Sequence, residues 1–367
     1  MNKQDNNFHT IRNIDDLLSV ENIFSWNYEK ISLLRNQCIL NRVRQLISEN
    51  KYYKQYCKQK NITIEMMENY INYTPKLPSS IFKKHSRYVD ENNRENTYLT
   101  TSSGTQGTLS KIPRDSVTMM RIYSSIFAGV LEILKLSKNF RLILLSPPNS
   151  EVDHLWIAYI LSGVAIHYDS KHYISGGKFE SEKFMKDIFV AAKDDRQTVI
   201  LGTPALIVEI AKKLDQLEHK LNFNSRCVVL SAGGWKKRSG EKINDSDYRK
   251  LVVKAFGLND ESYVMDIFNM VELNSVIFEC LKHKKHCPPW LYVRAFDPWT
   301  LKVCKSGEFG ILGYLDPTAN SFPGFVFSDD FGKVYEKVNC ECGITSDVVV
   351  IERRINKLES RGCALKI

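Results

Sequence analysis

The chain has 367 residues, of which 43% are hydrophobic and 25% charged, as expected of a globular protein with a large core. It has no apolar run near the roughly 18 to 20 residues that span a bilayer and no apolar segment at its start, which argues against a membrane span or a secretory signal and favours the cytoplasm. The net charge of +9 comes from scattered basic residues without a nucleic-acid motif, so an anionic small molecule or an acidic protein is the expected partner, with a solvated basic surface as the alternative.

The first part of the chain is expected to be helical. Between residues 15 and 72, apolar residues recur at helical spacing, as at Ile31, Leu34, Cys38, Ile39 and Val43. A turn rich in proline follows at residues 74–80. We expect residues 1–95 to be the mainly helical N-terminal part of a large domain.

The middle of the chain alternates between strands and helices. Apolar runs of strand length at residues 142–145, 199–201 and 228–230 end in Ser, Gly or Pro, and helical stretches at 118–136 and 205–217 separate them. This alternation predicts an α/β fold with largely parallel strands, in which ligands bind at the carboxyl ends of the strands. From about residue 275 to 345, shorter strands with Gly and Pro turns predict a mixed or antiparallel part.

A short segment rich in glycine and hydroxyl residues predicts a phosphate loop. Phosphates need close backbone N–H donors, small residues that let the chain approach, and hydroxyls that add hydrogen bonds. Lys111 adds a mobile positive charge, and no Gly-Lys-Ser/Thr ending makes this a Walker loop. The alternative is a surface turn. The expected ATP contacts come from Thr101, Ser102, Ser103, Gly104, Thr105 and Gly107, with Gln106 between the last two.

This loop resembles that of the adenylate-forming superfamily, and three further segments match that superfamily in the expected order. The segment 266–272 is similar to the one whose glutamate holds magnesium, which implies this role for Glu272. The segment 328–332 is similar to the one whose aspartate binds the ribose hydroxyls, which implies Asp330, with its neighbour Asp329 as the rival. Arg353, nine residues before Gly362, matches the spacing of the hinge segment.

A narrower resemblance covers residues from about 15 to the end. The segments 101–111, 233–236, 266–274 and 361–365 are similar to those of the LuxE-type acyl-protein synthetases, the long-chain-fatty-acid–protein ligases of bacterial luciferase operons. The resemblance implies the large domain of an adenylate-forming enzyme, with mixed, largely parallel sheets and flanking helices, and a truncated C-terminal domain. It divides the chain into residues 1–95, an adenylation core at 96–345, and a hinge remnant with a mobile tail at 346–367.

The resemblance also implies the reaction. A fatty acid and ATP, with Mg²⁺, give an acyl-adenylate and pyrophosphate, and the acyl group then moves to a cysteine near the C-terminus, here Cys363. From there it passes to an acyl-protein reductase. A cysteine thiolate is a strong nucleophile, and the neighbouring Arg361 or Lys366 would lower its pKa. A passive, docked Cys363 is the alternative.

Other residues complete the expected site. Gly233 and Gly234 would let the backbone approach the adenine face, with Trp235 packed nearby, unless this is a tight turn with a core tryptophan. His154 is expected to line the mouth of the acyl site, with a structural histidine as the alternative. For Glu272, an ordinary salt bridge is the alternative to magnesium.

The cysteines predict a structural zinc site. Nine cysteines without a secretory signal favour metal binding or nucleophilic chemistry over disulfides. Cys340 and Cys342 form a short chelating pair, and Cys280, His283, His286 and Cys287 lie upstream. We expect the ligands Cys280, His286, Cys340 and Cys342, with His283 as the rival histidine and free cysteines as the alternative. Phenylacetate-CoA-ligase-like enzymes of the same superfamily have a similar arrangement, which leaves open whether the chain serves luminescence.

The predicted function is therefore that of an ATP-dependent acyl-protein synthetase. One rival is an acyl- or aryl-CoA ligase, which would use coenzyme A as the acceptor. The other is a non-catalytic acyl carrier or scaffold subunit of a reductase complex, which would be acylated from an external donor without ATP.

Overall fold

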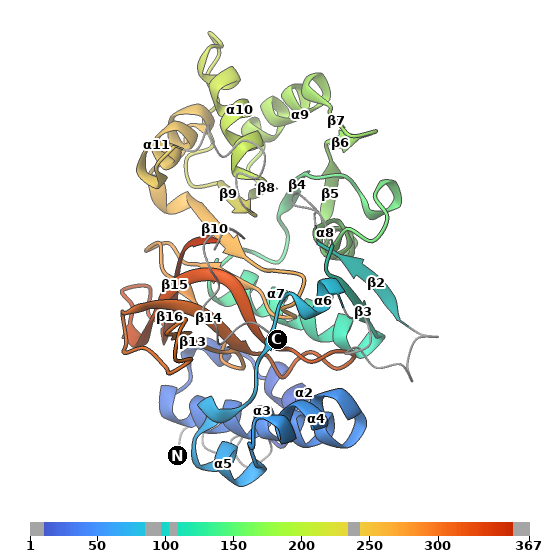
Figure 1. Ribbon diagram of the computed structural model, residues 1–367. Helices are drawn as coiled ribbons and strands as arrows, with labels where there is room; N and C mark the ends of the chain where they lie inside the picture. Colours follow the sequence, from blue (N-terminus) through green and yellow to red (C-terminus); the bar gives the residue numbers. More distant parts are fainter. Residues whose placement is uncertain (1–10, 85–96, 103–108, 234–242, 355–367) are drawn as a thin grey trace.

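The computed structural model describes residues 11–84, 97–102, 109–233 and 243–354. A large mixed sheet runs through the molecule, with N-terminal helices at one end and a helical layer at the other (Figure 1). Within the described residues, no helix is both long and apolar enough to cross a membrane. The division into residues 1–95, 96–345 and 346–367 remains a proposal.

The predicted helical start is confirmed. Its helices are α2 (Ile14–Leu18), α3 (Tyr28–Glu49), α4 (Lys51–Gln59), α5 (Ile64–Asn69) and α6 (Ile81–Lys84), with 3₁₀ turns at Ile23–Ser25 and Ile71–Tyr73. Asparagines cap α3 and α4, the two longest of these N-terminal helices. Asn27 accepts a hydrogen bond from the N–H of Lys30, and Asn50 accepts one from the N–H of Tyr53. The apolar positions predicted on α3 are buried, so this helix faces the core.

The parallel half of the sheet is also as predicted. It contains β4 (Arg141–Leu145), β5 (Asp169–His172), β8 (Thr198–Gly202), β9 (Cys227–Ala232) and β10 (Val264–Phe268), in the order β10-β9-β8-β4-β5. Helices α7 (Ser116–Glu132) and α8 (Trp156–Ala165) cover one face, and α9 (Ser181–Lys193), α10 (Pro204–Asp215) and α11 (Asp245–Phe256) cover the other (Figure 1). Side chains of β4 alternate between the two cores, as strand geometry requires.

The remaining strands are antiparallel. They are β11 (Ile277–Glu279), β12 (Lys285–His286), β13 (Tyr292–Phe296), β14 (Phe309–Leu315), β15 (Phe325–Asn339) and β16 (Thr345–Arg354). The exception is β1 (Leu77–Pro78), which pairs with β15 in parallel. The expected short strands were wrong for β15, which has 15 residues. It stays continuous because β14 and β16 pair along its sides, and three register shifts in these pairings absorb its bending.

Two small hairpins lie outside the main sheet. One joins β6 (Ile174–Ser175) and β7 (Lys178–Phe179). The other joins β2 (Tyr98–Thr101) and β3 (Lys111–Arg114) and lies beside α7 and α8 (Figure 1). The second hairpin flanks the predicted phosphate loop.

Candidate functional site

The β2–β3 hairpin fixes both ends of the predicted phosphate loop. Thr101 pairs with Lys111, and the N–H of Ser102 donates to the carbonyl of Ser110 at 3.2 Å. The N–H of Ser110 in turn donates to Ser102 Oγ at 3.2 Å. Lys111 is exposed. The two described ends of the loop are therefore adjacent, with the exposed cation Lys111 at its base.

Part of the predicted site lies outside the described residues. This applies to Ser103, Gly104, Thr105, Gln106 and Gly107 of the loop, to Gly234 and Trp235, and to Cys363. Their roles stay predictions.

Glu272 lies against the base of the loop. Its carboxylate Oε1 accepts a hydrogen bond of 2.5 Å from Ser110 Oγ, and its side chain is 7% exposed. A buried carboxylate next to the predicted phosphate loop would suit a magnesium ion, because magnesium prefers hard oxygen ligands. The structure thus brings together two segments, hairpin and glutamate, that the sequence analysis connected only through a resemblance.

His154 supports the hairpin. Its φ of +61° turns the backbone so that its carbonyl accepts from both the N–H of Thr101, at 2.6 Å, and Thr101 Oγ1, at 3.1 Å. Its ring nitrogen Nδ1 lies 2.9 Å from the carbonyl oxygen of Leu99. The ring is exposed at the outer side of β2. This arrangement is a structural role, and the proposed contact with the acyl chain stays a prediction.

Asp330 and its rival Asp329 occur side by side on β15 but differ in their surroundings. Asp330 is buried, and its N–H donates to Ser328 Oγ at 3.0 Å. Asp329 forms an ion pair of 3.4 Å with Lys83 on α6, and α6 packs against β3. Opposite them on β16, Arg354 pairs in register with Asp330 and Arg353 pairs with Phe331. The β15 segment is therefore linked to the hairpin through α6.

The carboxyl ends of β9 and β10 carry the segment predicted to face adenine. β9 ends at Ala232, and Gly233 follows with φ +78°, a conformation that favours glycine. On the neighbouring strand, Asp266 accepts from Ser231 Oγ at 2.7 Å and forms an ion pair of 3.0 Å with Lys285. Burial raises the pKa of Asp266, which Lys285 opposes. This edge is where parallel sheets bind ligands.

The four predicted zinc ligands converge. The ligand atoms of Cys280, His286, Cys340 and Cys342 all lie within 4.8 Å of one another. Cys280 Sγ is 3.9 Å from Cys340 Sγ, and Cys342 Sγ is 3.3 Å from His286 Nε2. Tetrahedral zinc with ordinary bond lengths implies about 3.8 Å and about 3.5 Å for these two separations. The donor set and spacing fit zinc, and His283 is outside the cluster.

The surroundings of the cluster also suit a metal. His286 is buried, and burial lowers its pKa to about 4, which keeps the ring neutral. Its Nδ1 lies 2.7 Å from Ser346 Oγ, so the tautomer that donates there leaves Nε2 facing the thiols. The N–H of Lys282 donates to Cys280 Sγ at 3.4 Å. The turns 280–284, before β12, and 340–344, before β16, carry the three cysteines, and β12 carries His286.

Residues 1–367 match the family described as "Acyl-protein synthetase, LuxE". The chain belongs to this family. It is therefore a ligase, as predicted. Two relatives named long-chain-fatty-acid–luciferin-component ligase are similar over almost their full length. The one from Aliivibrio fischeri is 29% identical and is aligned over 96% of this chain and 93% of its own, and the one from Vibrio harveyi is 28% identical over 96% and 92%.

Solved structures confirm the predicted fold class. The acyl-protein synthetase is similar to 2-hydroxyisobutyryl-CoA ligase in complex with 2-HIB-AMP and CoA, with a TM-score of 0.65, 15% identity, and coverage of 89% of this chain and 71% of that one. The same ligase in its thioester-forming state gives a TM-score of 0.66 at 15% identity. The fold is that of adenylate-forming enzymes.

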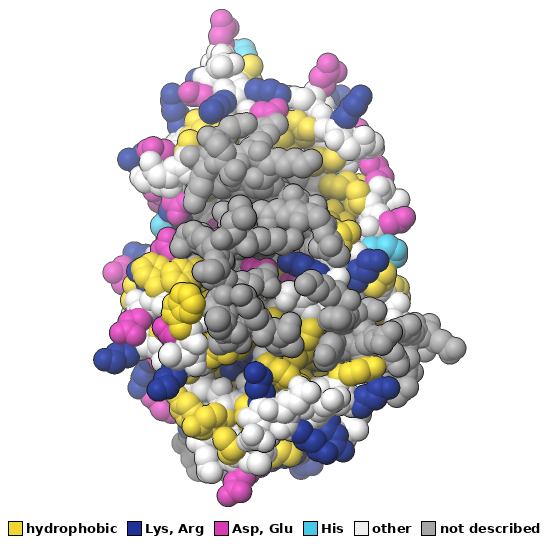
Figure 2. All heavy atoms as spheres, in the orientation of Figure 1, with side chains coloured by type: hydrophobic (Ala, Val, Ile, Leu, Met, Phe, Trp, Pro, Cys, Tyr) yellow, Lys and Arg dark blue, Asp and Glu magenta, His cyan; other side chains and the backbone are white. Residues whose placement is uncertain are grey.

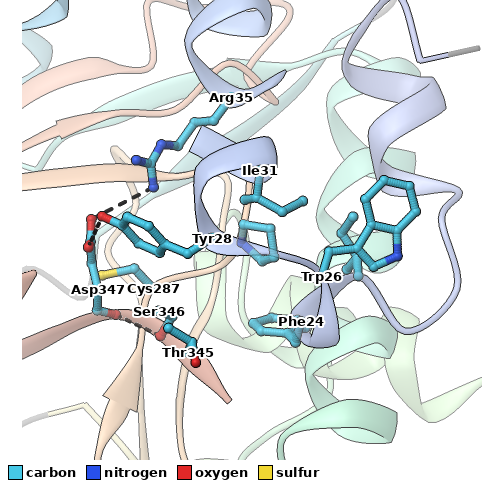
Figure 3. Close-up of a pocket in the computed structure, with 11 residues that line it drawn as sticks. Phe24, Trp26, Tyr28, Ile31, Arg35, Cys287, Thr345, Ser346 and Asp347 are labelled. Atoms are coloured by element: carbon cyan, nitrogen blue, oxygen red, sulfur yellow. Dashed lines mark hydrogen bonds and ion pairs between the residues drawn. The ribbon is translucent and has the colours of Figure 1, made fainter. Parts of the chain in front are cut away.

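A separate small pocket lies between α3 and β16, and no residue of the hairpin lines it (Figure 3). Phe24, Trp26 and Ile31 form its apolar wall, and Tyr28 donates to Asp347 at 2.6 Å. Arg294 also binds Asp347, at 2.7 Å. The described residues of the predicted ATP site do not line this pocket. Its polar side fastens the N-terminal helices of the synthetase to the sheet.

The sequence analysis missed the residues that join the site together. Ser110 was assigned no role from the sequence, although its hydroxyl reaches Glu272. Arg114, at the end of β3, is fully buried and contacts two other segments, β2 and the stretch 271–274. No motif marked it, because β3 reads Lys-Ile-Pro-Arg and only the folded structure shows that this arginine is buried and has to find partners.

Proposed function

We propose that this synthetase activates a long-chain fatty acid with ATP and then acylates its own Cys363. In the first step a carboxylate oxygen of the acid attacks the α-phosphorus of ATP, the bond to the β-phosphate bridging oxygen breaks, and pyrophosphate leaves. In the second step the Cys363 thiolate attacks the acyl carbon, the bond to the phosphate oxygen breaks, and AMP leaves. The names of the two relatives support the choice of acid.

The observation that carries the first step is the hydrogen bond of 2.5 Å between Ser110 and Glu272. It joins the return strand of the phosphate loop to the carboxylate that is to hold magnesium. Magnesium, when bound, neutralises phosphate charge. The chain itself would bind the phosphates through the loop and Lys111, bind the ribose through Asp330, and admit adenine beside Gly233.

Cys363 would then carry the acyl group to an acyl-protein reductase. A thioester suits such a carrier, because it is reactive enough for transfer to a second thiol or for reduction. Arg353 belongs to the strand that leads towards this part of the chain. We propose that it acts at the hinge between the two steps.

The test separates the two half-reactions. Acid-dependent ATP–pyrophosphate exchange, measured over a series of chain lengths, reports the first step. Label from a radioactive fatty acid that neutral hydroxylamine releases reports the second. Cys363→Ser is expected to keep exchange and lose this label, because serine without a neighbouring base is a poor nucleophile. Cys304→Ser, a partly exposed thiol outside the metal cluster, is the matched control and is expected to keep both.

Other outcomes would select the rival functions. Label retained in Cys363→Ser would overturn Cys363 as the acceptor. Exchange followed by transfer only when coenzyme A is added would indicate an acyl-CoA ligase. Acylation from an external donor, with no exchange for any acid, would indicate a carrier or scaffold.

We also propose that Cys280, His286, Cys340 and Cys342 hold one structural zinc ion. Four protein ligands complete a tetrahedral shell and leave no open position for catalysis. The convergence of the four ligand atoms supports this assignment.

A further inference from the structure

Arg114 lies at the meeting point of the hairpin and the Glu272 segment. It is the last residue of β3 and its side chain is fully buried. Its guanidinium donates to Thr100 Oγ1 on β2 and, at 2.5 Å, to the carbonyl of Val271. Thr100 Oγ1 donates in turn to the carbonyl of Ile112 at 2.7 Å. One side chain thus connects both strands of the hairpin with the residue next to Glu272.

The same guanidinium is held between two aromatic rings. Its central carbon lies 3.5 Å from the ring centroid of Trp156 and 5.0 Å from that of Phe322. Burial lowers the pKa of Arg114 to about 9, and the negative charges of Glu272 and Asp316 oppose this shift. The group therefore remains charged at neutral pH in a dry environment, where its hydrogen bonds are strong.

Trp156 extends the connection to the other side of Glu272. Its Nε1–H donates to Asn269 Oδ1 at 2.7 Å. Asn269 Nδ2 then donates to the carbonyls of Leu273, at 3.1 Å, and Ser275, at 2.8 Å. The backbone is consequently held on both sides of Glu272, by Arg114 before it and by Asn269 after it.

We propose that Arg114 is a positioning residue that sets the distance between the β2–β3 hairpin and Glu272. This inference rests on the proposed function, because it concerns how that site binds Mg²⁺ and ATP together. Arg114 has no described contact with the loop residues expected to touch ATP. It acts through Thr100 and Val271, and its planar fork is required because two donors must point at partners on different segments.

The test measures how strongly magnesium improves ATP binding. The dissociation constant of ATP is determined by calorimetry with Mg²⁺ and with EDTA, and the ratio of the two values reports the cooperation between Glu272 and the loop. Arg114→Lys keeps the charge but loses the fork, and we expect this ratio to fall about tenfold, since a small misplacement has large effects on a polar site. Glu272→Gln, which removes an anionic oxygen ligand, is the positive reference.

Arg294→Lys is the matched control. Arg294 is also a buried arginine, but its partner is a carboxylate of β16, Asp347, and not the hairpin. The Arg294→Lys variant is expected to have a lower thermal midpoint and an unchanged ratio of the two ATP dissociation constants. If Arg114→Lys lowers the midpoint alone, with an unchanged ratio, Arg114 is only a stabilising residue and the inference is wrong.

A second pair of variants covers the case in which Arg114→Lys does not fold. Thr100→Val removes one partner of Arg114 in a strand that favours valine, and Thr100→Ser retains the hydroxyl. We expect the ratio to fall in the first and to be preserved in the second. An unchanged ratio in Thr100→Val, with ATP bound normally by the wild type, overturns the inference alone. A wild type that binds no ATP overturns the proposed function and the inference with it.

Discussion

Single buried charged residues affect the folding stability of this molecule, and Lys76 is the clearest case. It is 2% exposed, its Nζ donates to the carbonyl of Thr74 at 3.1 Å, and it lies 4.6 Å from the ring centroid of Phe296. Burial lowers the pKa of Lys76 to about 7. An amine in this position is easier to bury neutral than charged.

The stability of the protein should therefore depend on pH through Lys76. Between about pH 7 and the ordinary lysine pKa near 10.4, the unfolded chain holds a proton that the native protein lacks, so this residue favours folding more as the pH rises. Lys76→Met should be more stable than the wild type at pH 6, and its advantage should shrink by at least about 1 kcal/mol at pH 9. Urea unfolding at both values measures this. Exposed Lys212→Met should show a constant difference, and a constant difference for Lys76→Met too would contradict the prediction.

The neighbouring aspartates of β15 allow a direct comparison at the same scale. Asp330→Asn should weaken ATP binding roughly tenfold, because a ribose hydroxyl loses a charged acceptor. Asp329→Asn should change ATP binding little, since its partner is Lys83. Calorimetric titration with ATP measures both. The reverse order of effects would assign the ribose to Asp329.

At the scale of elements, two tight turns are joined by the proposed metal. The turn at 280–284 closes with a hydrogen bond of 2.9 Å from the N–H of Cys280 to the carbonyl of Lys284, and that at 340–344 closes with one of 3.0 Å from Cys340 to Ile344. Gly343 has φ +96°, which permits the second turn. Each turn by itself only connects two strands. The proposed metal would link the two turns to each other.

The purified protein should contain about one equivalent of zinc, as expected for one complete tetrahedral shell. The double change Cys340→Ser and Cys342→Ser should abolish zinc and lower the thermal midpoint by several degrees, because metal binding contributes to folding. Elemental analysis and thermal unfolding test this. Cys304→Ser should retain the metal. Zinc-free protein prepared without chelator, with an unchanged midpoint in the double variant, would remove the site.

The elements best predicted from the sequence were those specified by nearby residues. The runs at 142–145, 199–201 and 228–230 are β4, β8 and β9, and the asparagine caps and apolar stripe define α3. The length of β15 was not predictable, since pairing with two neighbouring strands carries it through Gly332. Local composition does not contain that information.

At the scale of the whole molecule, the site is made by contacts between distant segments. Ser110 and Glu272 are 162 positions apart, and Arg114 and Val271 are 157 apart. Motif resemblance placed Glu272 and the loop in one site, but the residues between them had no motif to mark them. Long-range partners of buried polar groups follow from the folded topology, so Arg114 was found only in the structure.

The two cores explain why the site lies where it does. One core lies under α9, α10 and α11, and the other includes α3, α7, α8 and most of the antiparallel strands. The parallel strands separate the two cores. The carboxyl ends of these strands lie between helices α9 to α11 and the β2–β3 hairpin (Figure 1). Among the described residues on the face in Figure 2, basic and acidic side chains are intermixed.

The β16 strand has a consequence for how this chain can change over time. Its second residue, Ser346, contacts His286, and its third, Asp347, accepts a hydrogen bond from Tyr28. Its last residue lies opposite Asp330. Because successive side chains of a strand point to opposite faces, inserting one residue between Cys342 and Asp347 would turn Asp347 away from Tyr28 and displace the partner of Asp330. Substitutions here can be compensated by neighbours, whereas a change of length cannot. Relatives should therefore vary in amino-acid identity along this stretch while preserving its number of residues.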